Sequence, residues 1–264
     1  MSAVHYTDAY LLNPQHKVTV NLIGMGGTGS QVLTCLARLN ESLIGLGHAG
    51  IHVRAWDPDD VTMPNIGRQL FSHADIGANK AIALVTRINR FFGYDWEAYP
   101  ETFQEKRANI YISCVDTAAV RLELREIIRK SPVNGEPHYR SKYWLDIGNL
   151  QKTGQVVLGT APGIRIIQPE SEYATTESLP DVVRLFPELK RIKEEDQGPS
   201  CSLAQALNRQ DLFINSTLAQ FGVNLIWKLF REGMIKYHGC FVNLESFCVN
   251  PIRINLNKSL KSKI

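Results

Sequence analysis

The glycine-rich turn Gly24-Met25-Gly26-Gly27-Thr28-Gly29 follows an apolar run at 17–23 and precedes a segment with helical periodicity. Its spacing matches GxGxxG, a pattern that joins a strand to a helix in nucleotide-binding sheets. Glycine suits this turn because the backbone must adopt unusual dihedral angles and approach a phosphate closely. The free N–H groups at the start of the helix would face that phosphate. We therefore expect a phosphate-binding turn; the alternative is a tight turn without a ligand.

Segments typical of strands and helices alternate along the chain. Apolar runs predict strands at 17–23, 51–56, 109–115, 143–147 and 155–158. Helical periodicity predicts helices from residue 29 onward and at 79–92, 116–130 and 210–231. This alternation is typical of a doubly wound, Rossmann-like α/β fold, with a mainly parallel sheet and helices on both faces. Two final runs, 240–244 and 249–254, predict a C-terminal antiparallel hairpin.

The length and the polar segment at 168–200 determine the expected domain organisation. A chain of 264 residues suits one large α/β domain. The segment 168–200 contains the charge run 190–196 and differs from the apolar runs around it. We therefore expect a single domain over 1–264, with a polar crossover insertion at about 168–200.

Composition excludes several classes of protein. The chain is 44% hydrophobic and 21% charged, which is ordinary for a globular protein. Its net charge of +3 equals the contribution of three lysines in the last seven residues, so we expect no nucleic-acid partner. The sequence contains no run of 18 apolar residues, so it predicts no membrane-spanning helix. The five cysteines include no CxxC pair, which favours a reduced, cytoplasmic protein and argues against a four-cysteine zinc site.

Charged residues after the second strand indicate which nucleotide the turn would bind. Asp57 ends the strand 51–56, where a carboxylate can accept hydrogen bonds from ribose hydroxyls. Arg68 and Lys80 follow it. A dinucleotide such as NAD has no use for two added cations here, whereas a nucleoside triphosphate does, because arginine offers a planar fork and lysine a compact charge. Taken singly, each of these residues also suits a solvated loop or helix end.

Asp116 follows the predicted strand 109–115 and precedes a predicted helix. A carboxylate at this edge of a parallel sheet can bind Mg²⁺ through its oxygens. Aspartate is also a common helix N-cap, because its side chain accepts a hydrogen bond from the first free N–H groups. The residues alone leave both interpretations open.

In their order and spacing, these residues resemble the ThiF/MoeB/HesA superfamily, which has the fold of ubiquitin-activating enzymes. The segments that carry the resemblance are the glycine turn at 24–29, Asp57-Pro58-Asp59, Asn65-x-x-Arg68-Gln69, the run 75–80 and Cys114-Val115-Asp116. More narrowly, the segments 210–215 and 227–233 resemble the ThiF-family member of the PRTRC gene system.

The resemblance implies an adenylation reaction. The C-terminal carboxylate of a ubiquitin-like or sulfur-carrier protein would attack the α-phosphate of ATP, with Mg²⁺ bound and pyrophosphate leaving. It also implies a homodimer and a downstream conjugating protein as partners. Carried over by position, the resemblance implies that phosphates contact Gly24, Gly26, Gly27 and Gly29, that Asp57 holds the ribose, that Asp116 holds Mg²⁺, and that the phosphates are surrounded by Asp59, Asn65, Arg68, Gln69 and Lys80.

Two further expectations come from the resemblance. Some members transfer the activated acyl group to a cysteine, and Cys201 is the candidate here; the alternative is a small buried side chain. Many members bind zinc through two CxxC pairs, which this sequence lacks, so we expect no zinc. Two other functions stay open: a non-catalytic nucleotide-binding adaptor with the same fold, and an NAD(P)-binding oxidoreductase.

Overall fold

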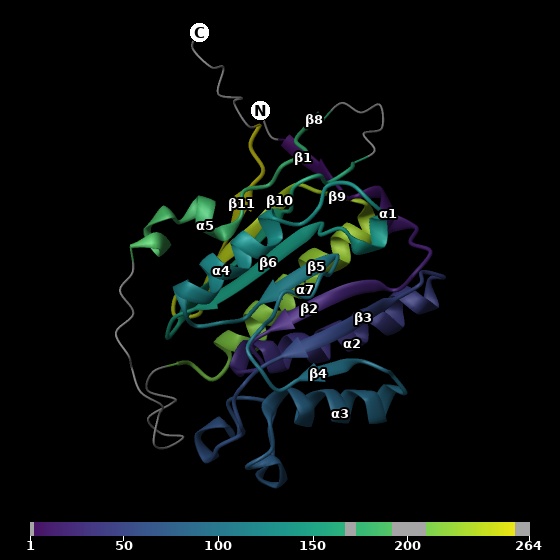
Figure 1. The fold of residues 1–264 in the computed structure, drawn as a ribbon. Coiled ribbons are helices and arrows are strands. Elements are labelled where there is room, and N and C mark those ends of the chain that lie inside the picture. Colours follow the sequence, from purple (N-terminus) through teal and green to yellow (C-terminus); the bar gives the residue numbers. More distant parts are fainter. Residues whose placement is uncertain (1–2, 167–172, 192–209, 257–264) are drawn as a thin grey trace.

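A computed structural model describes residues 3–166, 173–191 and 210–256. In these residues, eight strands form a central sheet in the order β11-β10-β7-β6-β5-β2-β3-β4 (Figure 1). The strands are β2 (Val18–Ile23), β3 (Ile51–Trp56), β4 (Glu97–Tyr99), β5 (Ile110–Ser113), β6 (Tyr143–Asn149), β7 (Thr153–Thr160), β10 (Tyr237–Asn243) and β11 (Cys248–Arg253). The pairings from β4 to β6 are parallel, and those of β7, β10 and β11 are antiparallel. The predicted sheet and C-terminal hairpin are confirmed.

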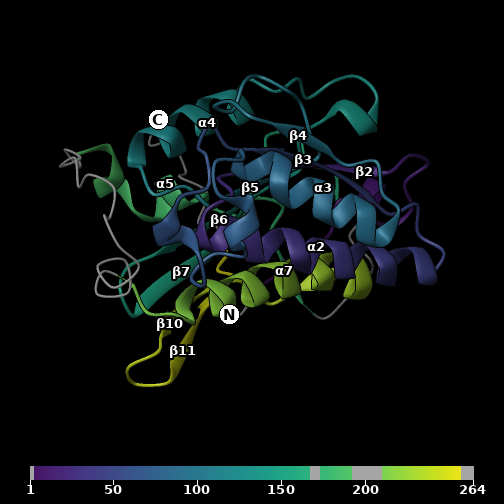
Figure 2. The same ribbon diagram turned by 90° about the horizontal axis from the view of Figure 1, so that it is seen from below.

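Helices cover both faces of this sheet (Figures 1 and 2). One face packs against α2 (Gly27–Gly45), α3 (Lys80–Phe92) and α7 (Ile214–Glu232), and the other against α4 (Ala118–Arg129) and α5 (Val182–Leu185). Alternation along the strands explains this, because successive side chains point to opposite faces. In β5, Ile110 and Ile112 belong to the core under α2, whereas Tyr111 belongs to the core under α4. The doubly wound arrangement is therefore as predicted.

A second, small sheet was not predicted from the sequence. Its order is β8-β1-β9, with β1 at Ala3–Tyr6, β8 at Ala174–Thr175 and β9 at Met234–Ile235. It joins the start of the chain to the segment before α5 and to the end of α7. The remaining elements are short: α1 (Ala9–Leu12) and the 3-10 helices η1 (Met63–Asn65), η2 (His73–Asp75), η3 (Pro137–Tyr139) and η4 (Pro187–Lys190).

The described part of the polar segment 168–200, residues 173–191, reaches the core. Besides the pairing of β8 with β1, Leu179, Val182 and Val183 are buried, the latter two beneath α4. None of the helices in residues 3–166, 173–191 and 210–256 combines the length and apolar character that crossing a membrane requires.

A buried histidine in β1 makes the stability of this fold depend on pH. The Nδ1–H of His5 donates to the carbonyl of Thr176 (2.9 Å), and its Nε2 accepts from the hydroxyl of Tyr143 (2.9 Å). That hydroxyl also accepts the N–H of Asp8 (2.9 Å). Burial lowers the pKa of His5 from 6.5 to about 4.

We expect the free energy of unfolding to fall as the pH drops from about 6.5 to 4. Between these pH values His5 binds a proton in the unfolded chain but stays neutral in the folded chain. The free energy of unfolding therefore falls, by about 3 kcal/mol in total at pH values below 4. Urea unfolding at pH 7 and pH 4.5 measures the loss. A His5→Gln variant has no proton to gain there and should lose less; equal losses in the variant and the original chain would contradict this explanation.

Candidate functional site

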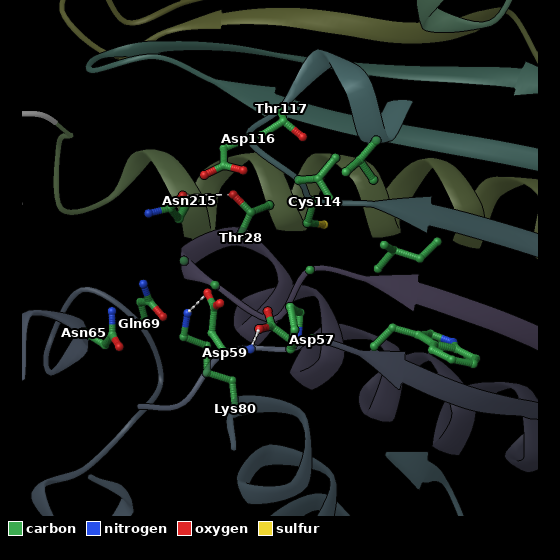
Figure 3. A pocket seen from close by; sticks show the side chains of 18 of the residues that line it. Thr28, Asp57, Asp59, Asn65, Gln69, Lys80, Cys114, Asp116, Thr117 and Asn215 are labelled. Atoms are coloured by element: carbon green, nitrogen blue, oxygen red, sulfur yellow. Dashed lines mark hydrogen bonds and ion pairs between the residues drawn. The ribbon is translucent and has the colours of Figure 1, made fainter. Parts of the chain in front are cut away.

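A cavity of about 530 Å³ opens at the carboxyl ends of β2, β3 and β5. The chain leaves β2 in one direction toward β3 and returns to β5 on the other side, and ligands bind at such switch points in open α/β sheets. Figure 3 shows Asp116 and Asn215 on one side of the cavity and Asp59 and Lys80 on the other. Of the predicted site residues in the described part of the chain, the lining includes Gly24, Gly26, Gly27, Asp57, Asp59, Asn65, Arg68, Gln69, Lys80 and Asp116.

Gly29 does not line the cavity, so its predicted contact with phosphates has no support from the geometry. It is buried in the first turn of α2, and a Cβ built on it would lie 1.8 Å from the carbonyl oxygen of Gly24. Gly29 therefore allows the helix to pack against the turn. Gly26, in contrast, faces open space: a Cβ built there meets no heavy atom within 4 Å and would lie on the open side of the turn.

Asp57 fixes the glycine turn to the end of β3. It is 5% exposed, and its Oδ2 accepts the N–H of Met25 (2.5 Å) while Oδ1 accepts the N–H of Asp59 (2.9 Å). Burial raises the pKa of this carboxyl, and the nearby charge of Lys80 acts in the opposite direction. Each carboxylate oxygen has two lone pairs, so both keep capacity to accept a further bond from a ligand hydroxyl.

Lys80 is paired with a carboxylate in this structure. Its Nζ lies 2.7 Å from Oδ2 of Asp59, and its side chain is 10% exposed against 66% for Asp59. The preceding residue, Asn79, caps α3 by accepting from the N–H groups of Ala81 and Ile82. The Nδ2 of Asn79 donates to the carbonyls of Asp57 (2.9 Å) and Asp59 (3.0 Å). Asn79 thus joins the start of α3 to the segment that follows β3.

Arg68 is the second cation of the cavity, and none of the ion pairs among the described residues includes it. Its Nη1 donates to Oε1 of Gln210, and burial lowers the pKa of the guanidinium. Nε of Arg68 and Oε1 of the neighbouring Gln69 are buried without a hydrogen-bond partner. Asn65 uses its Oδ1 to close the turn at Thr62 (2.8 Å to the N–H). A polar ligand would therefore meet donors and acceptors that the chain leaves partly unused.

Three amide side chains and a hydroxyl in the cavity wall were not predicted as site residues. Asn215, in the first turn of α7, accepts from Oγ1 of Thr28 (2.9 Å) and from Nδ2 of Asn149 (3.1 Å). Its own Nδ2 donates to Oε1 of Gln210 (3.0 Å). The first of these bonds joins α2 to α7 and is drawn in Figure 3. The sequence predicts the segment 210–215 as the start of a helix and as part of the resemblance to a subfamily, but not as part of the site; α7 begins at Ile214.

Asp116 lies in the loop after β5, where its exposed side chain lines the cavity. The N-cap interpretation is wrong, because α4 begins at Ala118 and its cap position is Thr117. Arg121 holds the loop in place: its guanidinium donates to the carbonyls of Val115 (2.6 Å) and Thr117 (3.1 Å) and forms a buried ion pair with Asp146 (2.9 Å). In the described residues, no group of three or more His, Cys, Asp or Glu side chains could bind a metal by itself.

The cysteines give the cavity no nucleophile within the described residues. Cys114 lines it, but burial raises the pKa of this thiol and keeps it protonated at neutral pH. Cys201, the predicted acceptor of an acyl group, lies outside the residues that the structure describes.

Comparisons with known proteins identify a family and solved structures with a similar fold. The family model described as ThiF family matches residues 12–231. Among solved structures, PaaA has a TM-score of 0.53 at 16% identity over 90% of this chain. MccB of E. coli, crystallised with MccA-N7isoASN, has a TM-score of 0.55 at 14% identity over 91% of this chain, and MccB with ATP has 0.53 at 14% over 93%. This chain spans only 64%, 64% and 65% of those three chains. No curated protein sequence matches it.

Proposed function

This chain belongs to the ThiF family, and we propose that it uses ATP to adenylate a carboxylate. The observation that carries the proposal is the convergence of Arg68, Lys80 and the glycine turn on one cavity. Arg68 and Lys80 supply charge for a triphosphate, and the open side of Gly26 leaves room for its oxygens. Asp57 lies at the strand end where, in other doubly wound sheets, a carboxylate accepts hydrogen bonds from the ribose hydroxyls.

In this reaction a negatively charged carboxylate must approach the negatively charged triphosphate of ATP. A carboxylate oxygen forms a bond to the α-phosphorus, the bond to the bridging oxygen breaks, and pyrophosphate leaves with the electron pair. Positioning and cationic stabilisation dominate such a step, and Arg68 and Lys80 provide both. Gln69 and Asn65 line the same wall and offer amide groups to phosphate oxygens.

Asp116 suits magnesium bound together with the triphosphate. Mg²⁺ takes one or two carboxylates plus substrate phosphates rather than a complete protein cage, and a single exposed carboxylate at this edge fits that preference. Bound there, Mg²⁺ would neutralise phosphate charge. The buried pair of Arg121 and Asp146 fixes the loop from which Asp116 extends.

We propose the C-terminal carboxylate of a small ubiquitin-like or sulfur-carrier protein as the substrate. The support is the resemblance of the motifs at 24–29, 57–59, 65–69 and 75–80 to enzymes that act on such carriers. MccB of E. coli, which is similar in fold, has been crystallised together with MccA. A homodimer and a downstream conjugating protein belong to the same proposal and rest on the resemblance.

ATP–pyrophosphate exchange tests this function. We expect exchange with at least one member of a panel of small ubiquitin-like and sulfur-carrier proteins, and none with the same protein lacking its last residues, because the free C-terminal carboxylate is the nucleophile. Binding of ATP without exchange across the whole panel would favour a nucleotide-binding adaptor. Binding of NADH but not ATP, measured by fluorescence titration, would favour an oxidoreductase.

A further inference from the structure

We infer that Gln210 is a positioning residue that holds Arg68 at the cavity wall without neutralising its charge. This inference rests on the proposed function, since it concerns how the guanidinium is kept ready for a triphosphate. It assigns a role to the hydrogen-bonded chain that crosses the cavity from Arg68 to Gln210 and Asn215.

Gln210 is held through its amide oxygen, which accepts two hydrogen bonds. Its Oε1 accepts from Nη1 of Arg68 and from Nδ2 of Asn215 (3.0 Å). Asn215 is 2% exposed and is itself fixed by Thr28 and Asn149. The position of the Arg68 guanidinium is therefore set by contacts that begin in the first turns of α2 and α7. A long side chain held this way loses less rotamer freedom when it binds a ligand.

Lys80 and Arg68, the two cations that line the cavity, differ in the kind of side chain that each one contacts. Lys80 faces a carboxylate, Asp59, which cancels its charge until a ligand competes. Arg68 faces a neutral amide, and no described residue forms an ion pair with it. A carboxylate in place of Gln210 would add the attraction between two opposite charges to the hydrogen bond with the guanidinium, and phosphate would have to displace it. The amide thus orients Arg68 while leaving its full charge for the anion.

Two substitutions of matching length separate positioning from mere structural support. Gln210→Met removes the acceptor, and Gln210→Glu keeps an acceptor at the same place but adds a charge. The probe is ATP with Mg²⁺, titrated by calorimetry, with thermal unfolding of each variant as a check of the fold. A Gln220→Glu variant, on the exposed side of α7, controls for the change in net charge.

We expect the dissociation constant for ATP to rise a few-fold in Gln210→Met and at least about tenfold in Gln210→Glu. Gln220→Glu should bind ATP like the original chain. If Gln210 were only a structural acceptor, the order would reverse, with Gln210→Glu close to the original chain and Gln210→Met weaker; that order overturns the inference. Failure of the original chain to bind ATP would instead refute the proposed function, and this inference with it.

A second measurement separates an effect through Arg68 from direct repulsion between a carboxylate at position 210 and the triphosphate. In an Arg68→Ala background, the added penalty of Gln210→Glu should shrink, because there is no guanidinium left to trap. An unchanged penalty in this double-mutant comparison would show that Gln210 acts independently of Arg68 and would also overturn the inference.

Discussion

Arg68→Ala is expected to lower the rate of carrier-dependent ATP–pyrophosphate exchange by about 10³-fold. Arg68 is the cation that the cavity leaves without an ion pair among the described residues, so its charge is fully available to the triphosphate. Arg68→Lys keeps the charge but loses the planar fork and should retain only part of the activity. Exchange assays at saturating carrier, with ATP varied, measure the loss.

The matched control for this prediction is Arg90→Ala. Arg90 is an exposed arginine on α3, outside the cavity lining, and its removal lowers the net charge equally. We expect this variant to exchange pyrophosphate at the original rate. Equal activity of Arg68→Ala and Arg90→Ala would show that Arg68 has no part in the reaction.

Gly29→Ala is expected to destabilise the fold by more than about 3 kcal/mol, the range reached only by severe packing defects. The added Cβ would lie 1.8 Å from the carbonyl oxygen of Gly24, and neither the turn nor the helix can yield, because both are backbone. Asp57 also ties this turn to β3 through the N–H of Met25. Urea unfolding of the purified variant, or its failure to accumulate as folded protein, measures the effect.

Gly26→Ala is the matched control in the same turn. A Cβ there meets nothing within 4 Å, so we expect a loss of no more than about 1 kcal/mol, the cost of alanine in place of glycine at the N-cap of α2. The methyl group enters the open side of the turn, so affinity for ATP should fall even though the fold is kept. Equal stability of Gly29→Ala and the original chain would contradict the packing role of Gly29.

The central sheet could be predicted because its signals are local. The runs that become β2, β3 and β5 are rich in apolar and β-branched residues, and each is followed along the chain by a segment with helical periodicity. The small sheet could not, because its strands have two to four residues and β1 finds its partners about 170 and 230 positions away. Such short segments carry no periodicity, and only the folded chain brings them together.

The parts of the site that follow single strands could likewise be predicted. Asp57 comes directly after β3 and Asp116 follows β5 within three residues, and the parallel topology brings both to one edge of the sheet. The distinction between the glycines could not be predicted, since spacing does not show which position faces the cavity and which faces the turn. Gln210 and Asn215 depend on how α7 packs against α2, a contact about 190 residues apart in sequence.

A crystal structure with a nonhydrolysable ATP analogue and Mg²⁺ tests the central claim most directly, namely that Arg68, Lys80 and the glycine turn bind one triphosphate. We predict phosphate oxygens within hydrogen-bond distance of both the guanidinium of Arg68 and the ammonium of Lys80, beside the open side of Gly26. A triphosphate bound elsewhere, or bound in the cavity with either cation turned away from it, would contradict the claim.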